Sequence, residues 1–280
     1  MIIINVTKAS GELQNYSEAK VRQSIERAGI STDLQNKVMH EIEEKLYENI
    51  PTRVIADLIA SSLRDLFPAG ERRYQLKRAI MELGPTGFPF EKFIARLLRE
   101  YGYTTDLDVI MQGVCVKHEV DVLATKENRQ YFVECKYHNQ YGSRTDVKTV
   151  LYVKARGDDI AEQIQQRIST ENETEHGPWI FTNTKFSVDA IAYAQCKNIR
   201  LTGWGYPDKG NLQQMIENKK LYPITCLSGL SHVQKETLIN NNLLFVDQLC
   251  NNDEIIEKIG FNKDQIGHIS KECSLLTNTN

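Results

Sequence analysis

The sequence predicts a multidomain α/β protein with a helical N-terminal domain, a central α/β/α domain built on a mixed sheet, and a small all-α C-terminal domain. The breaker cluster at residues 84–87, Gly-Pro-Thr-Gly, separates a helix-rich N-terminal part from the remainder. Residues 117–126 and 131–138 alternate apolar and polar side chains, which predicts two neighbouring strands. Helical patterns return after about residue 221. The expected domains are residues 1–84, 87–206 and 219–280.

The composition is that of an ordinary globular protein. Of the 280 residues, 41% are hydrophobic and 25% are charged, and the formal net charge is −3. No apolar run approaches the ~20 residues of a membrane-spanning helix, and the chain does not start with the basic segment of a signal peptide. Six cysteines are scattered without a CxxC pair, which argues against a disulfide scaffold or a zinc ribbon. We therefore expect a cytoplasmic protein with no membrane partner.

The N-terminal domain is expected to contain one short strand followed by four helices. Residues 2–7 predict the strand, and Ser10-Gly11 predicts a turn after it. Ser17 is a suitable N-cap for the first helix, and Pro51-Thr52 is a suitable start for the third. The four helices are expected to begin near Ser17, Thr32, Pro51 and Gly70.

This arrangement, and several residues in it, resemble the ATP-cone, a small nucleotide-sensing domain known from ribonucleotide reductases. The matching residues are Val6-Thr7-Lys8, Gly11, Tyr16, Lys20-Val21 and Pro51-Thr52. The resemblance implies that Lys8 and Lys20 reach the phosphates of ATP or dATP, with Val6 and Val21 beside them in the same two motifs. Lys20 would lie in the first turn of its helix, where backbone N–H groups and the helix dipole favour an anion.

Two further observations bear on the nucleotide. The ATP-cone family often has a second basic residue directly after the lysine of the strand, and this chain has Ala9 there. Retained nucleotide binding and a fold that has lost its ligand therefore both stay open. No GxxxxGK[ST] loop occurs, so ATP hydrolysis as a motor is not expected. We expect a bound nucleotide to act as an allosteric ligand.

The central domain is expected to begin with an amphipathic helix. Apolar side chains recur at helical spacing from Phe90 to Tyr101. Helices on a mixed sheet make this an α/β domain. Its later elements are expected at residues 109–116 (strand), 145–169 (one or two helices) and 179–203 (strand, helix and strand).

The two alternating strands carry an unusual set of charges. If their turn is centred on Glu127-Asn128, Asp121 lies opposite Glu134. In the same register Glu119 lies opposite Lys136. Like charges directly opposed on a sheet are destabilising, so a structural role for Asp121 and Glu134 is hard to motivate. A divalent metal between the two carboxylates removes the conflict.

An aspartate, twelve intervening residues and then Glu-Cys-Lys resemble the PD-(D/E)xK nuclease motif in its Mrr-like restriction endonuclease form. Residues 90–98 resemble the first helix of that family, and residues 179–183 begin a segment that resembles its closing strand, helix and strand. The resemblance implies a restriction-endonuclease-like α/β/α core in which Asp121, Glu134 and Lys136 are catalytic.

The same resemblance implies a metal site. Asp121, Glu134 and the backbone carbonyl of Cys135 would hold Mg²⁺, a hard ion that prefers oxygen ligands. Lys136 would position the attacking water or stabilise the pentavalent phosphorus. Glu91 has two interpretations: it complements the dipole of its helix, or it is the supporting acid that the family places near the metal. We favour the dipole role.

A basic stretch follows the carboxylate hairpin. Its members are Arg129, Lys136, Arg144, Lys148, Lys154 and Arg156. A polyphosphate backbone would approach the site here, which favours DNA as the partner despite the negative net charge; a solvated helix face is the alternative. His138 lies on the Lys136 face of its strand, where it would donate to a phosphate or cap a sheet edge.

The C-terminal domain contains a motif that resembles a helix-hairpin-helix, Leu-Ser-Gly-Leu-Ser at residues 227–231. Such a motif presents the backbone N–H groups of a glycine turn to a phosphate. Residues 259–261 resemble a degenerate second copy. Ser231 stands where typical hairpins have a second glycine, and a side chain there restricts the approach of a backbone. DNA contact and a packing or dimerisation role both stay open.

The leading hypothesis from the sequence is a Mg²⁺-dependent DNA endonuclease of the restriction or defence type, regulated by ATP or dATP. The alternative is a nucleotide-responsive DNA-binding regulator with an inactive nuclease core. ATP-cone repressors pair the cone with a zinc ribbon, which this sequence lacks, and this favours the nuclease. Because two DNA strands need two active centres, we expect a homodimer or a higher homo-oligomer. The specificity for DNA sequence, methylation or strand stays open, as does the direction of the nucleotide effect.

Overall fold

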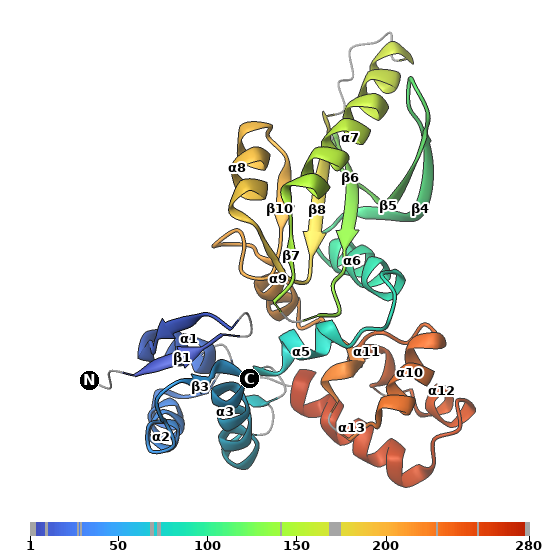
Figure 1. Cartoon of the computed structure of the whole chain (residues 1–280). Helices are drawn as coiled ribbons and strands as arrows, with labels where there is room; N and C mark the ends of the chain where they lie inside the picture. The colour runs from blue at the N-terminus through green and yellow to red at the C-terminus, as the bar shows by residue number, and fades with distance from the viewer. Residues whose placement is uncertain are drawn as a thin grey trace. The chain divides into compact units, whose positions relative to one another are not determined.

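The computed structural model describes residues 4–8, 11–26, 28, 30–67, 70–71, 74–140, 142–167, 175–227, 229–250 and 252–277. Ala9 and Ser228, which belong to the two motifs named above, lie outside these ranges. The chain divides into two compact units, residues 1–79 together with 222–280, and residues 80–221. Figure 1 labels the helices and strands of each unit.

The N-terminal segment of the first unit begins with a three-stranded sheet, where the sequence predicted a single strand. Its strands are β1 (Asn5–Thr7), β2 (Leu13–Asn15) and β3 (Ile50–Pro51). Strand β1 pairs antiparallel with β2 and parallel with β3. The two additional strands hold three residues and two, which is too short for an alternating pattern to show in the sequence.

Helices accompany this sheet in the predicted order. They are α1 (Glu18–Glu26), α2 (Thr32–Glu43), α3 (Thr52–Leu66) and, after residues that are not described, α5 (Leu76–Met81). The first three begin at the predicted position or one residue later. Buried apolar side chains of strands and helices form one core, which includes Val6, Ile25, Val38, Ile42, Ile50, Ile59 and Leu63.

The second unit is built on a five-stranded sheet in the order β10-β8-β6-β5-β4. The strands are β4 (Thr104–Gln112), β5 (Lys117–Lys126), β6 (Arg129–Lys136), β8 (Glu175–Thr182) and β10 (Arg200–Thr202). Strand β5 pairs antiparallel with β4 and β6, whereas β8 pairs parallel with β6 and β10, so the sheet is mixed as predicted. The strand expected at residues 109–116 ends at Gln112, because the turn to β5 follows it.

Helices cover this sheet. They are α6 (Phe88–Glu100), α7 (Val147–Arg167), α8 (Val188–Cys196) and α9 (Leu212–Lys219). Helix α7 is one continuous helix that crosses the sheet in front of β6 and β8 in Figure 1. Helix α6 packs against β4, β5 and β6, and its apolar face from Phe90 to Leu98 is buried as predicted. A separate two-stranded parallel sheet is formed by β7 (Arg144–Thr145) and β9 (Lys185–Phe186).

The hairpin of β5 and β6 has the predicted register. Lys126 pairs with Arg129 across a two-residue turn. Glu127 in this turn has φ 53°, in the left-handed region that hairpin turns of this length require. The turn and the buried face together fix the register, because a slip by one residue would move every apolar side chain to the other face.

The C-terminal segment of the first unit is helical, as predicted. Its elements are η1 (Ile224–Cys226), α10 (His232–Asn240), α11 (Val246–Leu249), α12 (Asp253–Lys258) and α13 (Lys263–Thr277). Ser231 and Gln234 form a capping box at the start of α10. The N–H of Gly229, which the hairpin resemblance assigns to a phosphate, donates to Oε2 of Glu272 at 3.3 Å. This internal contact favours the packing interpretation over DNA contact.

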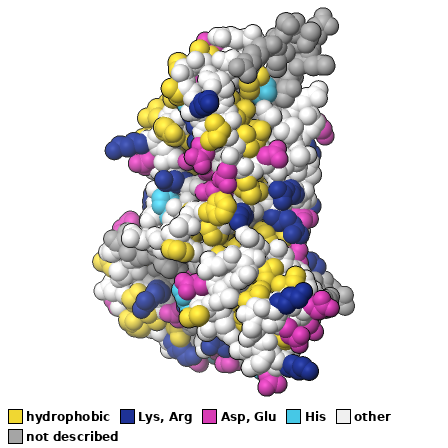
Figure 2. Space-filling model, turned by 90° about the vertical axis from the view of Figure 1, so that its right-hand side faces the viewer, with side chains coloured by type: hydrophobic (Ala, Val, Ile, Leu, Met, Phe, Trp, Pro, Cys, Tyr) yellow, Lys and Arg dark blue, Asp and Glu magenta, His cyan; other side chains and the backbone are white. Residues whose placement is uncertain are grey.

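Within the described part of the chain, no helix combines the length and the apolar character needed to cross a bilayer. Figure 2 shows one face of the molecule, on which the acidic and basic side chains of the described residues are interspersed. A DNA contact on this face would therefore depend on local groups of charge rather than on a broad basic surface.

Candidate active site

The candidate site lies where strands β5 and β6 stop pairing. Their ladder ends at Val122 and Val133, and the next step in this register sets Asp121 opposite Glu134. The Asp121 carboxylate takes the place of a backbone acceptor, because its Oδ2 accepts a hydrogen bond from the N–H of Cys135 at 2.7 Å. In a paired strand the N–H and C=O of one residue point to the same side. The carbonyl of Cys135 therefore faces β5 as well.

Glu134 is held by a buried arginine. Nη2 of Arg156, in helix α7, lies 2.6 Å from Oε2 of Glu134. Nη1 of Arg156 donates to the backbone carbonyl of Glu119 at 2.9 Å. The arginine is only 6% exposed, so it is not part of a DNA-facing basic surface as the sequence interpretation had it. Its guanidinium instead connects β6 to β5 at the point where their ladder has ended.

Several carboxylates lie near this point, and burial and their mutual repulsion raise the pKa values of two of them. Burial, followed by the charge of Glu134, raises the pKa of Asp121 to about 6. Burial, followed by the charges of Asp121 and Asp108, raises the pKa of Glu91 to about 7. Glu91 therefore belongs electrostatically to the site, which favours the supporting-acid interpretation over the dipole role that we preferred from the sequence. Asp108 has φ 54°, an uncommon conformation for a residue other than glycine.

The oxygen atoms of this cluster fit a hard divalent cation. Asp121 and Glu134 each use one carboxylate oxygen, and within the described chain no hydrogen bond engages Oδ1 of Asp121 or Oε1 of Glu134. Among the described residues no three His, Cys, Asp or Glu side chains are arranged to hold a metal. The oxygens that could hold a cation here are those of the two carboxylates and the carbonyl of Cys135. Oxygens of this kind are ligands that Mg²⁺ prefers. The pKa values of Asp121 and Glu91 are raised first by burial and then by neighbouring carboxylates, and a cation would offset the repulsion between these carboxylates.

Glu119 and Lys136 lie beyond the last paired residues of β5 and β6, so the ladder does not join them, although the register is the predicted one. On their other sides, Glu119 pairs with Ile110 of β4 and Lys136 with Thr182 of β8. The ladder of β5 and β6 ends before it reaches either residue, because the side chain of Asp121 replaces the backbone there. Lys136 is exposed at the end of β6, two residues after Glu134 in the chain.

His138 is fixed to its surroundings through both backbone and ring. Its N–H donates to Oδ1 of Asn183 at 2.9 Å, and Nδ2 of Asn183 donates to the His138 carbonyl at 2.7 Å. The ring Nε2 lies 3.1 Å from Oγ1 of Thr145. Burial, followed by the charge of Lys136, lowers the pKa of the ring, so His138 is neutral at pH 7. These contacts favour the sheet-edge role over donation to a phosphate.

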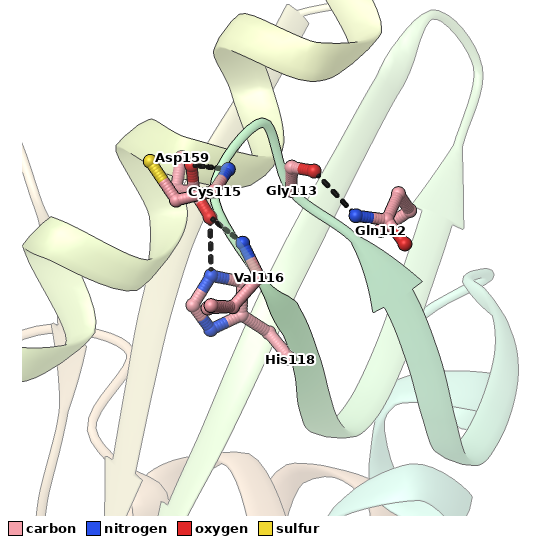
Figure 3. A network of polar contacts seen from close by, with 6 residues as sticks. All are labelled: Gln112, Gly113, Cys115, Val116, His118 and Asp159. Atoms are coloured by element: carbon pink, nitrogen blue, oxygen red, sulfur yellow. Dashed lines mark hydrogen bonds and ion pairs between the residues drawn. The ribbon is translucent and has the colours of Figure 1, made fainter.

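A single carboxylate of α7 holds the turn that joins β4 to β5 (Figure 3). Asp159 accepts hydrogen bonds from the backbone N–H groups of Cys115 at 2.8 Å and Val116 at 3.4 Å. Its Oδ2 also lies 2.7 Å from Nε2 of His118. These donors, led by the Cys115 N–H, lower the pKa of Asp159 to about 2. The network fixes the start of β5, the strand that carries Asp121.

The residues that the ATP-cone resemblance assigns to the nucleotide lie in two elements. Val6 is buried in β1, and Lys8 follows that strand. Nζ of Lys8 lies 2.9 Å from Oε2 of Glu12 in an ion pair at the surface. Lys20 lies in the first turn of α1, as predicted, and is exposed. Val21 is partly buried against the core, so the two valines support the fold around the lysines.

Three protein-family models match successive parts of the chain. A model of the ATP cone domain matches residues 4–81. A restriction endonuclease model of the Mrr catalytic type matches residues 85–205. A model of the C-terminal region of AF1548-like proteins matches residues 222–277.

Two relatives place the chain in a family. The crystal structure of a protein of unknown function, AF1548, is 34% identical in sequence with a TM-score of 0.56, and the match covers 68% of this chain and 98% of that chain. The chain belongs to the AF1548-like family. A protein of Archaeoglobus fulgidus, described as an uncharacterized protein, is 39% identical over 184 residues, which are 64% of this AF1548-like chain and 97% of the relative.

Arg156 is the residue of this AF1548-like site that sequence reasoning misplaced. A basic residue near a nuclease motif suggests a phosphate contact, but helical spacing carries a different signal. Arg156 lies three residues after Val153 and four before Ile160, and both of these are buried. Residues at this spacing share one face of a helix. The apolar stripe of α7 therefore predicts a buried arginine, which needs an acidic partner.

Proposed function

We propose that this AF1548-like chain is a Mg²⁺-dependent deoxyribonuclease of the restriction type whose activity is set by ATP or dATP bound to the ATP-cone. One observation carries the proposal: Asp121 and Glu134 each lie one residue beyond the last paired residues of the β5–β6 ladder, and each has one oxygen that no described residue engages. The match to the Mrr-type restriction endonuclease model supports phosphodiester hydrolysis. The match to the ATP cone model supports a nucleotide ligand.

Each site residue has a role in this proposal. Asp121, Glu134 and the carbonyl of Cys135 hold the metal. A bound Mg²⁺ lowers the pKa of a coordinated water and offsets charge on the phosphorus oxygens. Lys136, exposed at the end of β6, positions the attacking water or stabilises the pentavalent phosphorus. Glu91, with a pKa of about 7, supplies a carboxyl group that exchanges its proton near neutral pH.

A plasmid-nicking assay with Mg²⁺ or with EDTA tests the nuclease. The parent should cut supercoiled DNA only with the metal. Asp121→Asn and Lys136→Ala should lower the rate by about 100-fold or more, because each removes a group that acts on the reacting atoms. Asp106→Asn on β4 and Lys117→Ala on β5 are matched controls, since both side chains are exposed on neighbouring strand positions. Equal rates in site and control variants reject the assignment.

The nucleotide part is tested by adding ATP or dATP to the same assay. Lys20→Ala removes the ammonium group at the start of α1, and Lys37→Ala removes an exposed one from α2 as the control. The rate should change with nucleotide in the parent and in the Lys37 variant, and stay constant in the Lys20 variant. If ATP and dATP leave the cleavage rate of the parent unchanged, this part of the proposal is contradicted.

A second function is favoured by one observation, the occupation of Glu134 by the buried Arg156. The guanidinium neutralises the charge of this carboxylate and so weakens its attraction for a cation, as expected of a nuclease core that no longer cuts. The chain would then be a nucleotide-responsive DNA-binding regulator. Gel-shift titrations beside the nicking assay separate the two functions, because DNA binding that responds to ATP without Mg²⁺-dependent cutting assigns the regulator.

We also propose domain limits at residues 1–84, 87–206 and 219–280, with two copies of the chain required to cut both strands. The breaker cluster and the three family matches support these limits. The second compact unit nevertheless extends to residue 221. Helix α9 belongs to it, since Oη of Tyr101 donates to the carbonyl of Met215 in α9 at 3.2 Å.

A further inference from the structure

Arg156 is placed to control the geometry of the carboxylate pair. It is 6% exposed, and its two terminal nitrogens contact different strands, Glu134 in β6 and the Glu119 backbone in β5. We propose that Arg156 is a positioning residue, which sets the separation of β5 and β6 so that Asp121 and Glu134 can share one metal ion. This inference rests on the proposed nuclease function and adds a residue that the D-x₁₂-E-x-K motif does not contain.

The guanidinium of Arg156 connects β5 and β6 where the backbone hydrogen bonds between them have ended. Backbone hydrogen bonds set the spacing of β5 and β6 only as far as Val122 and Val133. Beyond that step, Nη1 of Arg156 holds the carbonyl of Glu119 at 2.9 Å while Nη2 holds the carboxylate of Glu134 at 2.6 Å. Because the guanidinium is planar and rigid, these two contacts fix the distance between the strands. A lysine has a single nitrogen on a flexible stem, so it would hold the two strands less rigidly.

The contacts also orient the two carboxylates. Arg156 engages only Oε2 of Glu134, and the Cys135 N–H engages only Oδ2 of Asp121. Each acid is thus anchored through one oxygen. Without an anchor, two neighbouring carboxylates would rotate or move apart because they repel each other. Anchoring before the metal arrives reduces what must be ordered when it binds.

The opposite role is that Arg156 merely replaces the metal and leaves when it binds. Burial argues against this, because a guanidinium that lost Glu134 would remain largely buried with an unpaired charge. The contact to the Glu119 carbonyl argues against it as well, since that bond does not depend on Glu134. One turn further along α7, Asp159 holds the start of the same strand. Helix α7 therefore contacts β5, or the turn before it, through two side chains, Arg156 and Asp159.

The two roles predict opposite effects on metal affinity, and isothermal titration calorimetry with Mn²⁺ on the full chain measures it. A positioning residue predicts that Arg156→Met and Arg156→Lys both weaken Mn²⁺ binding by about 10- to 100-fold, the usual effect of losing a group that orients a metal ligand. Lys154→Met is the matched control, because Lys154 lies on the same helix and pairs at the surface with Asp158. It should bind Mn²⁺ as the parent does.

Arg156→Lys keeps the positive charge and loses the fork, so it separates geometry from charge. A cooperative melt in EDTA shows that each variant is folded, and if the methionine variant is not, the lysine variant decides. Unchanged or tighter Mn²⁺ binding in the folded variants overturns the positioning role and leaves the proposed nuclease intact. A parent that does not bind Mn²⁺ overturns the nuclease proposal, and the positioning role falls with it.

Discussion

The Asp121 carboxylate, one residue beyond the last paired residue of β5, accepts a hydrogen bond at 2.7 Å from the backbone N–H of Cys135, two residues beyond the last paired residue of β6. A carboxylate thus accepts the hydrogen bond that a backbone carbonyl would accept if the ladder continued. Burial and the charge of Glu134 raise the pKa of this carboxylate to about 6. Such an arrangement lowers the stability of the metal-free protein. Local loss of stability of this kind is typical of functional sites, and it leads to predictions that need no activity assay.

Glu91 should destabilise the metal-free protein increasingly as the pH rises. Its pKa is raised to about 7, first by burial and then by Asp121. An acid with a raised folded pKa contributes its full stability only below its unfolded pKa, and this contribution is lost as the pH rises through the folded value. In EDTA, Glu91→Gln should therefore be more stable than the parent at pH 8 and equal to it at pH 4. Because the side chain is partly exposed, we expect a difference on the order of 1 kcal/mol.

Thermal melts of the Glu91 variant and the parent at both pH values measure this difference. Glu127→Gln, at the exposed turn of β5 and β6, is the control and should show no such dependence on pH. A stability difference between Glu91→Gln and the parent that is the same at pH 4 and pH 8 would mean that Glu91 is not coupled to the cluster.

Asp121→Asn should stabilise the apo protein and abolish its response to metal. Asparagine keeps an acceptor for the Cys135 N–H and removes the buried charge. From the raised pKa of about 6 we expect a gain of about 1–3 kcal/mol at pH 8 in EDTA. Mg²⁺ should raise the melting temperature of the parent by binding only the folded state. A variant that gains as much from Mg²⁺ as the parent does would show that the metal binds elsewhere.

The turn held by Asp159 should weaken in acid. Its pKa is lowered to about 2, first by the hydrogen bond from the Cys115 N–H. An acid with a lowered folded pKa contributes stability above its unfolded pKa, about 4, and this is lost as the pH falls through the folded value. The parent should therefore lose protection of the Cys115 and Val116 amides from hydrogen exchange between pH 4 and pH 2. Asp159→Asn should show weak protection already at pH 7, and equal protection there contradicts the account.

Gly113 should tolerate no side chain while Asp159 is in place. A Cβ added there would lie 2.0 Å from Oδ2 of Asp159 and 2.9 Å from the carbonyl of Val116. Gly113→Ala should destabilise the chain by about 1–3 kcal/mol, as overpacking usually does. Denaturant unfolding of a double-mutant cycle measures the coupling. In an Asp159→Ala background the effect of Gly113→Ala should shrink, and an undiminished effect would place the clash elsewhere.

Glu12 should compete with a nucleotide for Lys8. Their side chains form an ion pair at 2.9 Å, in which Glu12 is exposed and Lys8 is half-buried. Pairs of this kind contribute about 0.2–1 kcal/mol, so Glu12→Gln should tighten ATP binding by roughly 2- to 5-fold. Calorimetric titration with ATP measures the affinity, with Asp33→Asn, an exposed acid on α2, as the control. Unchanged affinity in the Glu12 variant would mean that Lys8 does not reach the phosphates.

Much of the fold follows from local patterns in the sequence. The period-two runs and the turn at Glu127 fix the register of β5 and β6, because one face of the hairpin is buried. The helix start near Ser17 follows from a capping residue, whose Oγ accepts a hydrogen bond from the N–H of Lys20 at 3.4 Å. Strands β2 and β3 did not follow, because two or three residues are too few for a period and depend on the neighbouring strand.

The site was predicted only in part, because its details depend on tertiary contacts. The opposition of Asp121 and Glu134 follows from counting residues along the hairpin. The point at which the ladder stops does not, since it depends on the Asp121 side chain reaching the Cys135 N–H. Arg156 in α7 and Glu134 in β6 are 22 residues apart in the chain. No local pattern therefore identifies Glu134 as the partner, although the buried stripe of α7 predicts that Arg156 needs an acidic partner.

The central claim is that Asp121, Glu134 and the carbonyl of Cys135 hold one metal ion. Anomalous diffraction from Mn²⁺-soaked crystals of the full chain tests it most directly. The account predicts an anomalous peak about 2.0–2.3 Å from Oδ1 of Asp121, Oε1 of Glu134 and the Cys135 carbonyl oxygen, with the contact of Arg156 to Oε2 of Glu134 retained. Saturated crystals with no peak among these atoms, or with a peak only elsewhere, would contradict it.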